Sequence, residues 1–306
     1  MPYYSNFSYL NIPFTIEALQ NNMWVKFTDG NFTASNITYT KTSNGVTTTG
    51  TCGSNISLNE GDTVSFEGPS GLYRSGDYDS YKLYTFSCNG NISMYGNMNS
   101  LIGHSRKVLA NNFRTLFMNN NYIQDISNLY MDFDEIGDHG CQAMFHTCRN
   151  IKTPAHWNVP HIFGEWACGW MHYNNESLTS VIPFEPTGTV AKYAFIAPYG
   201  MNNYAPQIVN ADYVIPSNLT LNYGSMCWTF EKNTNLKRGP IFGKNYTFGS
   251  SDSGSETTFY HYFYNCSNLS AIEVQFTNWA TSNGTSVTNE WVYGVQTNNN
   301  CVFIVP

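Results

Sequence analysis

Residues 12–100 alternate between apolar and polar positions with a period of two. Such alternation is typical of strands that bury one face of a sheet. The clearest runs are residues 14–19, 23–28, 37–40, 63–67, 82–86 and 92–95. Clusters rich in Asn, Gly and Asp separate these runs and supply turns. The pattern predicts an antiparallel β-sandwich over residues 12–110, preceded by an N-terminal extension of residues 1–11.

A different pattern follows residue 110, with short apolar groups at three-residue steps. Each copy has an aromatic anchor, then Asn or Cys three positions later, then an aliphatic residue at six. The anchors are Phe117, Phe145, His172, Phe195, Phe230 and Phe263, with intervals of 28, 27, 23, 35 and 33 residues. The copy at His172 departs from Phe, and the copy at Phe195 is disrupted. The predicted repeat core is Phe117, Phe145, Cys148, Ile151, Leu178, Phe230, Leu236, Phe263, Cys266 and Leu269.

Recurrence at this spacing predicts a solenoid over residues 111–306. One coil cannot bury its apolar side alone, so stacked coils align equivalent residues into columns. The column three positions after the anchor accepts small groups that meet backbone, which suits both Asn and Cys. The two longest intervals predict loops that leave the solenoid around residues 205–225 and 243–258, where partners often bind.

Two of the copies resemble the BspA-like leucine-rich repeats. They are residues 144–151 (Met-Phe-x-x-Cys-x-x-Ile) and 262–269 (Tyr-Phe-x-x-Cys-Ser-Asn-Leu). Such repeats occur in surface proteins of gut Bacteroidales and in gut bacteriophages, including crAss-like ones. Residues 14–19, 60–66 and 95–102 resemble the β-sandwich that precedes these repeats, and residues 290–295 resemble the family's closing segment. The resemblance implies a mainly β fold and a function in adhesion or display.

Charged residues make up only 11% of the chain, against roughly 25% in an ordinary globular domain. The net charge is −7 and no run of Lys or Arg appears, which argues against nucleic-acid binding. No segment reaches the ~20 apolar residues of a membrane span. Residues 1–20 lack the features of a signal peptide, which favours a protein used without secretion or one trimmed at this end. The eight cysteines form no Cys-x-x-Cys pair, and we expect reduced, buried thiols.

The sequence predicts no catalytic residue, metal or cofactor, because neither a zinc site nor a glycosidase pair has the expected pattern. Zinc sites usually show short paired spacings, whereas the Cys and His residues between 139 and 172 are spread out. They are His139, Cys141, His146, Cys148, His156, His161, Cys168 and His172. Glycoside hydrolysis needs two carboxylates that flank the bond. The acidic groups are Asp132, Asp134, Glu135 and Asp138, with Asp77 and Asp79 as a second group. Acidic turns of this kind are usually solvated.

Aromatic residues in or beside the repeats are better candidates for a binding surface. Tyr and Trp supply rigid contact area with a polar tip, and sugar rings stack on such faces. The predicted ligand-binding residues are Trp157, Trp166, Trp170, Tyr173 and Trp228. The alternative is that many of them belong to the core.

The sequence therefore predicts a non-enzymatic structural protein on the exterior of a gut bacteriophage virion, such as a head or tail fibre or a capsid decoration. Its expected partners are other virion proteins, a host surface glycan or protein, and further copies of itself in a homo-oligomer. Neither nucleic acid nor membrane insertion is expected. Two alternatives remain: a bacterial cell-surface adhesin with the same fold, and a polysaccharide-degrading enzyme of the tailspike kind.

Overall fold

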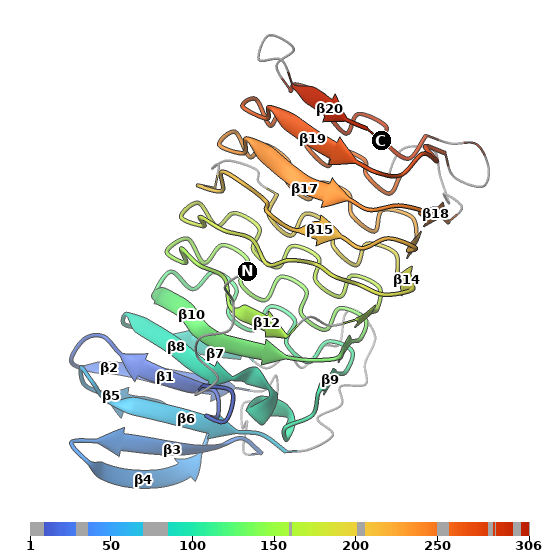
Figure 1. The fold of residues 1–306 in the computed structure, drawn as a ribbon. Coiled ribbons are helices and arrows are strands. Elements are labelled where there is room, and N and C mark those ends of the chain that lie inside the picture. The colour runs from blue at the N-terminus through green and yellow to red at the C-terminus, as the bar shows by residue number, and fades with distance from the viewer. Residues whose placement is uncertain are drawn as a thin grey trace.

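The computed structural model describes residues 9–28, 36–69, 85–158, 161–200, 206–249, 257–280, 284, 286–295 and 301–305. Within these residues the protein is mainly β, with a short 3-10 helix, η2 (Met98–Ile102), and no α-helix. None of the described helices has the length and apolar character to cross a membrane. The strands stack along one long axis, with the N-terminal strands at one end and β20 (Val302–Ile304) at the other (Figure 1).

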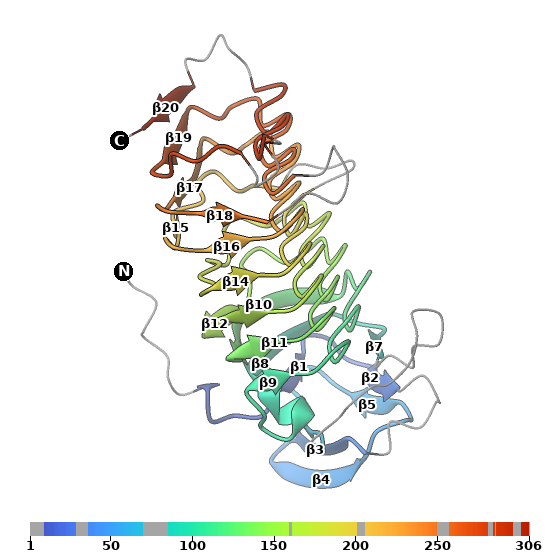
Figure 2. The same cartoon turned by 90° about the vertical axis from the view of Figure 1, so that its right-hand side faces the viewer.

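The C-terminal two-thirds is a β-solenoid of about six turns. One side is a six-stranded parallel sheet to which each coil adds one short strand (Figure 2). In order these strands are β9 (Lys107–Val108), β11 (Glu135–Ile136), β13 (Ile162–Phe163), β14 (Thr189–Val190), β16 (Thr220–Leu221) and β18 (Thr247–Phe248). A second side ends in a four-stranded parallel sheet. Its strands are β15 (Val214–Ile215), β17 (Arg238–Phe242), β19 (Ala271–Val274) and β20.

The N-terminal strands form two sheets. The smaller is β5 (Ile56–Leu58), β2 (Met23–Thr28) and β7 (Thr85–Cys88), paired antiparallel. The larger has seven strands, in the order β12 (His156–Asn158), β10 (Ile123–Asp132), β8 (Ile92–Asn97), β1 (Thr15–Ala18), β6 (Thr63–Glu67), β3 (Thr38–Ser43) and β4 (Val46–Thr51). Phe27 of β2 meets Phe66 of β6, with ring centroids 4.8 Å apart, so apolar side chains join the two sheets.

The larger sheet continues across the predicted domain boundary at residue 110. Strand β8 pairs antiparallel with β1 on one side and parallel with β10 on the other. The buried core is also continuous, because Phe117 packs against Phe14 and Phe86 as well as against Phe145. The first coil of the solenoid therefore uses the N-terminal sheets as its neighbour.

The third side of the solenoid consists of overlapping β-turns, and we call it the turn face. It comprises residues 111–119, 139–147, 166–174, 193–200, 224–232, 259–265 and 290–294. Successive N–H groups alternate between two partners. Gln142 donates to the carbonyl of His139 within its own coil (3.2 Å), whereas Ala143 donates to Gly169 in the next coil (2.8 Å). Every backbone donor along the turn face can be satisfied in this way without a regular strand.

Aromatic rings stack along the inside of the solenoid at most of the anchor positions. Phe145 lies between Phe117 and His172 at centroid distances of 5.3 Å on both sides, with interplanar angles of 10° and 9°. Phe230 stacks on Phe263 further along, at 6.0 Å. All ten predicted repeat-core residues are buried, with exposed fractions of 0–1%. His172 is therefore a true substitute for Phe in this column.

The predicted anchor of the fourth copy is wrong. Tyr199, not Phe195, stacks on His172 (6.1 Å) and on Phe230 (5.6 Å). The N–H of Cys168 donates to Ala194, which places Phe195 beside Cys168 in the column four positions before the anchor. The observed anchors Phe117, Phe145, His172, Tyr199, Phe230 and Phe263 give intervals of 28, 27, 27, 31 and 33 residues.

The predicted loops are also wrong for residues 206–225 and 243–249. Strands β15 and β16 occupy the first segment and β18 occupies the second, and all three are paired within the stacked sheets. Ile208 and Ala211 are buried. The extra residues of these coils thus go into strands such as β15, which starts the four-stranded sheet. Of the other predicted loop residues, 205 and 250–256 lie outside the described residues, and 257 and 258 are buried.

Candidate binding face

Four of the five predicted aromatic residues come together on the turn face. Trp166, Trp170, Tyr173 and Trp228 surround a small buried group made of Ile196, Ala197 and Cys227. Two further residues, Tyr193 and Tyr260, complete the set, and the sequence analysis did not identify either of them. We call Trp166, Trp170, Tyr173, Tyr193, Trp228 and Tyr260 the aromatic cluster.

The rings of the aromatic cluster are half-buried and lie close together. Trp166 is 5.1 Å from Trp170 and 4.7 Å from Tyr193, measured between ring centroids. Trp228 meets the edge of Tyr260 at 5.8 Å. Tyr173 stacks instead on His146, at 5.2 Å. Each of the six side chains packs on the small buried group and keeps part of its surface open to solvent. This arrangement offers rigid aromatic faces to a ligand.

The backbone conformation under the cluster is unfavourable for large residues. Trp166, Trp170, Tyr193 and Trp228 all have left-handed backbone, with φ between 55° and 58°. Asn is the residue that tolerates this conformation best after Gly. Equivalent positions in other coils carry smaller or polar residues: Asn111 and His139 in the column of Trp166, and Thr115, Ala143, Ala197 and His261 in the column of Trp170 and Trp228. The fold therefore does not require aromatic residues here, and a bulky residue in this conformation costs stability.

A hydrogen-bonded histidine fixes one edge of the cluster. The indole N–H of Trp228 donates to Nδ1 of His261 (3.1 Å), and Nε2 of His261 lies 2.9 Å from a carboxylate oxygen of Glu290. Because Nδ1 accepts, the neutral ring carries its proton on Nε2 and donates to Glu290. Tyr260 and Tyr264 stack on the two sides of the imidazole, at centroid distances of 3.8 and 4.0 Å.

Glu231 places a carboxylate inside this aromatic surface. Its side chain is only 17% exposed, and its nearest ion-pair partner, Lys232, is 3.6 Å away. Burial raises the pKa of Glu231, while the charges of Lys232 and His261 oppose that shift. Burial, aided by the negative charge of Glu231, raises the pKa of Tyr173 to about 12. The carboxylate and the phenol are therefore electrostatically coupled across the coil between them.

The intervening coil places Gly200 between these two residues. The N–H of Asn174 donates to Gly200, and the N–H of Tyr199 to Thr229, which aligns Tyr173, Gly200 and Glu231 in one column. A Cβ at residue 200 would come within 2.8 Å of the Trp228 carbonyl oxygen. Gly200 is buried, so the glycine allows the coils to pack closely at this position.

Trp157 lies apart from the aromatic cluster. It sits on β12, half-buried, and meets the edge of Phe184 at 6.3 Å. Its indole N–H is buried, and among the described residues it has no hydrogen-bond partner. Trp157 therefore packs at the edge of the core, as the alternative interpretation of these aromatic residues predicts.

The acidic residues between 132 and 138 are bound to cationic side chains or to a backbone N–H. Arg106 binds both Asp132 and Asp134, and its hydrogen bond lowers the pKa of Asp134. Lys107 pairs with Glu135 at 2.7 Å. Asp138 accepts a hydrogen bond from the N–H of Glu165 (2.8 Å). Asp77 and Asp79 lie outside the described residues.

The Cys and His residues do not converge on one point. Within the described part of the chain, no group of three or more His, Cys, Asp or Glu side chains could hold a metal ion. All eight cysteines are free thiols, and six of them are buried. Cys148 illustrates their use, because its thiol donates to the carbonyl of Phe117 (3.0 Å) and burial raises its pKa.

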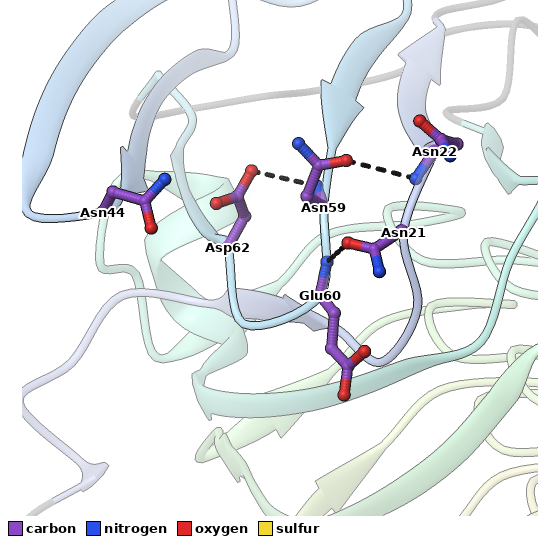
Figure 3. Close-up of a pocket in the computed structure, with 6 residues that line it drawn as sticks. All are labelled: Asn21, Asn22, Asn44, Asn59, Glu60 and Asp62. Carbon is purple, nitrogen blue, oxygen red and sulfur yellow. Dashed lines mark hydrogen bonds between the residues drawn. The ribbon is translucent and has the colours of Figure 1, made fainter.

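A polar hollow of about 520 Å³ lies among three turns at the N-terminal end (Figure 3). Its lining residues are Asn21, Asn22, Asn44, Asn59, Glu60 and Asp62. Three of the oxygens are already occupied. Asn59 Oδ1 accepts from the Asn22 N–H, Asn21 Oδ1 from the Glu60 N–H, and Asp62 from the Asn59 N–H. These bonds hold the turns together, so the hollow is a weaker ligand site than the aromatic cluster.

Comparisons with family models, with curated proteins and with solved structures each found no match to this chain. The turn face offers groups that suit a carbohydrate ligand. Its aromatic rings can stack on sugar rings, and the carboxylate of Glu231 can accept hydrogen bonds from hydroxyl groups.

Proposed function

We propose that the protein is a non-enzymatic display protein whose turn face binds a host surface glycan through the aromatic cluster. The observation that carries the proposal is the position of Trp166, Trp170 and Trp228. They are half-buried against the same small group of Ile196, Ala197 and Cys227, and they are held in left-handed backbone that Asn would adopt at lower cost. Large aromatic residues kept at strained, partly open positions are expected at binding surfaces.

The proposal extends to the setting of the protein. We place it on the exterior of a gut bacteriophage virion, as a fibre or capsid decoration. There it would form a homo-oligomer and contact other virion proteins. Residues 12–110 would be the β-sandwich, and the solenoid a set of BspA-like leucine-rich repeats. The support is the sequence resemblance together with a solenoid whose rings stack at the repeat positions. Paired carboxylates between residues 132 and 138 give no support to the enzymatic alternative.

Removal of one ring tests the binding role. We expect Trp170→Ala to weaken binding to a glycan array hit by about tenfold or more, because stacking surface at the centre of the cluster is lost. Tyr122→Ala is the matched control, since Tyr122 is 45% exposed and lies outside the cluster. Circular dichroism should show both variants folded. Equal binding by the two variants would contradict the proposal.

Location tests the virion setting. Peptide mass spectrometry on density-purified phage particles and on bacterial envelope from the same culture should find the protein in particles at a fixed copy number. Recovery from the envelope alone would instead support a bacterial adhesin with the same fold.

A further inference from the structure

The last coil leaves an apolar surface at the C-terminal end of the solenoid. Among the described residues, six of the thirteen large apolar side chains that are exposed belong to residues 279–305. They are Trp279, Tyr293, Val302, Phe303, Ile304 and Val305. Trp291 connects part of this surface to the core, because its ring centroid lies 5.9 Å from those of Trp279 and Phe303. Terminal coils of soluble solenoids carry a polar outer surface, so this end has the character of an interface.

Strand β20 leaves one edge of its sheet unpaired. Among the described strands it pairs with β19 alone, to which it is parallel (Figure 1). The N–H of Val302 donates to Ser270 on that side (3.0 Å). Because successive residues of a strand direct their N–H and C=O groups to opposite sides, those of Phe303 point to the free edge. Strand β20 contains neither a charged residue nor a proline that would block pairing at this edge.

Phe303 faces the interior of the solenoid but is not covered there. It is the register partner of Ile272 on β19, so the two side chains lie on the same face of the sheet. Ile272 is fully buried, whereas Phe303 is 44% exposed. The difference arises because β19 has a strand on each side and β20 has a strand on one side. A further strand beside β20 would bury the Phe303 ring as the neighbouring strands bury Ile272.

We propose that β20 pairs antiparallel with β20 of a second copy, about a two-fold axis between the two Phe303 residues. In this register Phe303 exchanges both backbone hydrogen bonds with Phe303 of the partner subunit. On the outer face of the sheet, Val302 lies opposite Ile304 of the partner subunit, so apolar side chains meet. Residues 291–306 contain no charged side chain, so identical ends meet there without like charges. A two-fold contact closes on itself and gives a dimer.

The opposite end of the molecule does not fit β20. Its edge strand, β4, has the sequence Val-Thr-Thr-Thr-Gly-Thr and is exposed over most of its length. Apart from Val46 and Gly50 its side chains carry hydroxyl groups, so a head-to-tail contact would set the apolar side chains of β20 against polar ones. Such a contact would also extend into a filament instead of closing. The inference is independent of glycan binding, and it assigns the surface through which the proposed homo-oligomer forms.

Sedimentation of the full chain over a range of concentrations tests the dimer. We expect a monomer–dimer equilibrium, and Ile304→Lys should weaken dimerisation by about tenfold or more, because the interface then contains two lysines without partners. Val46→Lys is the matched control, because it makes the same kind of change on an exposed edge strand at the other end. It should leave the dimer unchanged. Circular dichroism and thermal unfolding should show both variants folded.

Hydrogen exchange reports the pairing of the strand edge itself. Peptides that contain residues 301–305 should exchange more slowly at concentrations where the dimer forms, and Ile304→Lys should abolish this difference. A chain that stays monomeric at millimolar concentration would overturn the inference and leave glycan binding intact. Assemblies that grow beyond two copies and are weakened by Val46→Lys would replace the two-fold contact with a head-to-tail one. A dimer that Ile304→Lys leaves unchanged would overturn the assignment to β20.

Discussion

His172 occupies a position that is Phe in most other coils. Its ring stacks as a Phe ring does, but it can also bind a proton and form hydrogen bonds. Its ring lies between Phe145 and Tyr199, and 2% of the residue is exposed. One nitrogen is within 3.1 Å of the Asn175 amide, whereas Nε2 is buried without a hydrogen-bond partner among the described residues. Burial lowers the pKa of His172 from 6.5 to about 3. The histidine is therefore neutral in the folded protein over most of the acid range.

This shift makes stability depend on pH in a defined direction. The unfolded chain binds a proton at His172 below about pH 6.5, and the folded protein does so only below about pH 3. The stabilising contribution of the neutral ring is thus fully present above pH 6.5 and is lost as the pH falls toward 3. At pH 5 the loss is about 2 kcal/mol, on the scale of ~1.4 kcal/mol for each pH unit.

We expect His172→Phe to remove this part of the acid sensitivity. At pH 8 the free energy of unfolding should change little, because a gained apolar contact offsets the lost bond to Asn175. At pH 5 the variant should be about 2 kcal/mol more stable than the unmodified protein. Urea denaturation at the two pH values measures the difference. His139, His146 and His156 also have lowered pKa values and act equally in both proteins. A gain of the same size at both pH values would contradict the argument.

At the scale of the coil, glycine decides where a ring from the neighbouring coil can lie. Gly224 is the equivalent of Tyr193 in the next coil and has φ of 59°. A Cβ at residue 224 would come within 2.4 Å of the Tyr193 ring. Gly188 has φ of 68° and open space around it, so it isolates the cost of the left-handed backbone.

We therefore expect Gly224→Ala and Gly188→Ala to differ. Gly188→Ala should destabilise the protein by about 1 kcal/mol through backbone strain alone. Gly224→Ala should cost about 2 kcal/mol, because the Tyr193 ring must also move. Thermal or urea unfolding of the two variants measures both values. Equal losses would mean that the Tyr193 ring yields without cost and that the cluster is looser than its packing indicates.

Sequence reasoning found the columns of the solenoid but not the faces between them. Period-three steps identify residues that point inward, and these were predicted well except in the fourth coil. There Tyr199 and Asn202 fit the anchor pattern three residues apart, whereas Phe195 matches the commonest anchor residue but lies four positions too early. The turn face left no sequence signal, since Trp and Tyr are not residues that mark left-handed turns.

The sequence predicts individual residues of the candidate site but not that they lie together. Trp166, Trp170, Tyr173 and Trp228 were chosen for their chemistry, and only the true register shows that they are neighbours. An interval of 23 residues for the fourth coil displaces Tyr193 from the column of Trp166, which explains why Tyr193 was missed. Trp157 has the same chemistry but lies on a strand, where its ring packs toward Phe184.

At the scale of the whole molecule, one core joins the N-terminal sheets to the solenoid. Phe117 is the link, with Phe14 and Phe86 on one side and Phe145 on the other. Backbone pairing follows the same route, because β8 bonds to β1 and to β10. Each coil of a solenoid depends on its nearest neighbours, so the first coil and the N-terminal sheets should unfold together.

Hydrogen exchange in mild denaturant tests this coupling. We expect peptides from residues 12–69 and from 123–132 to share one opening free energy, and Phe117→Ala to lower both by about 3–5 kcal/mol. Phe276→Ala is the control at the other end, where the ring is also buried. It should lower protection near β19 and leave residues 12–69 unchanged, because nearest-neighbour coupling fades along the coils. If Phe117→Ala lowers protection in the solenoid alone, the N-terminal sheets are a separate folding unit and the boundary at residue 110 is a true domain boundary.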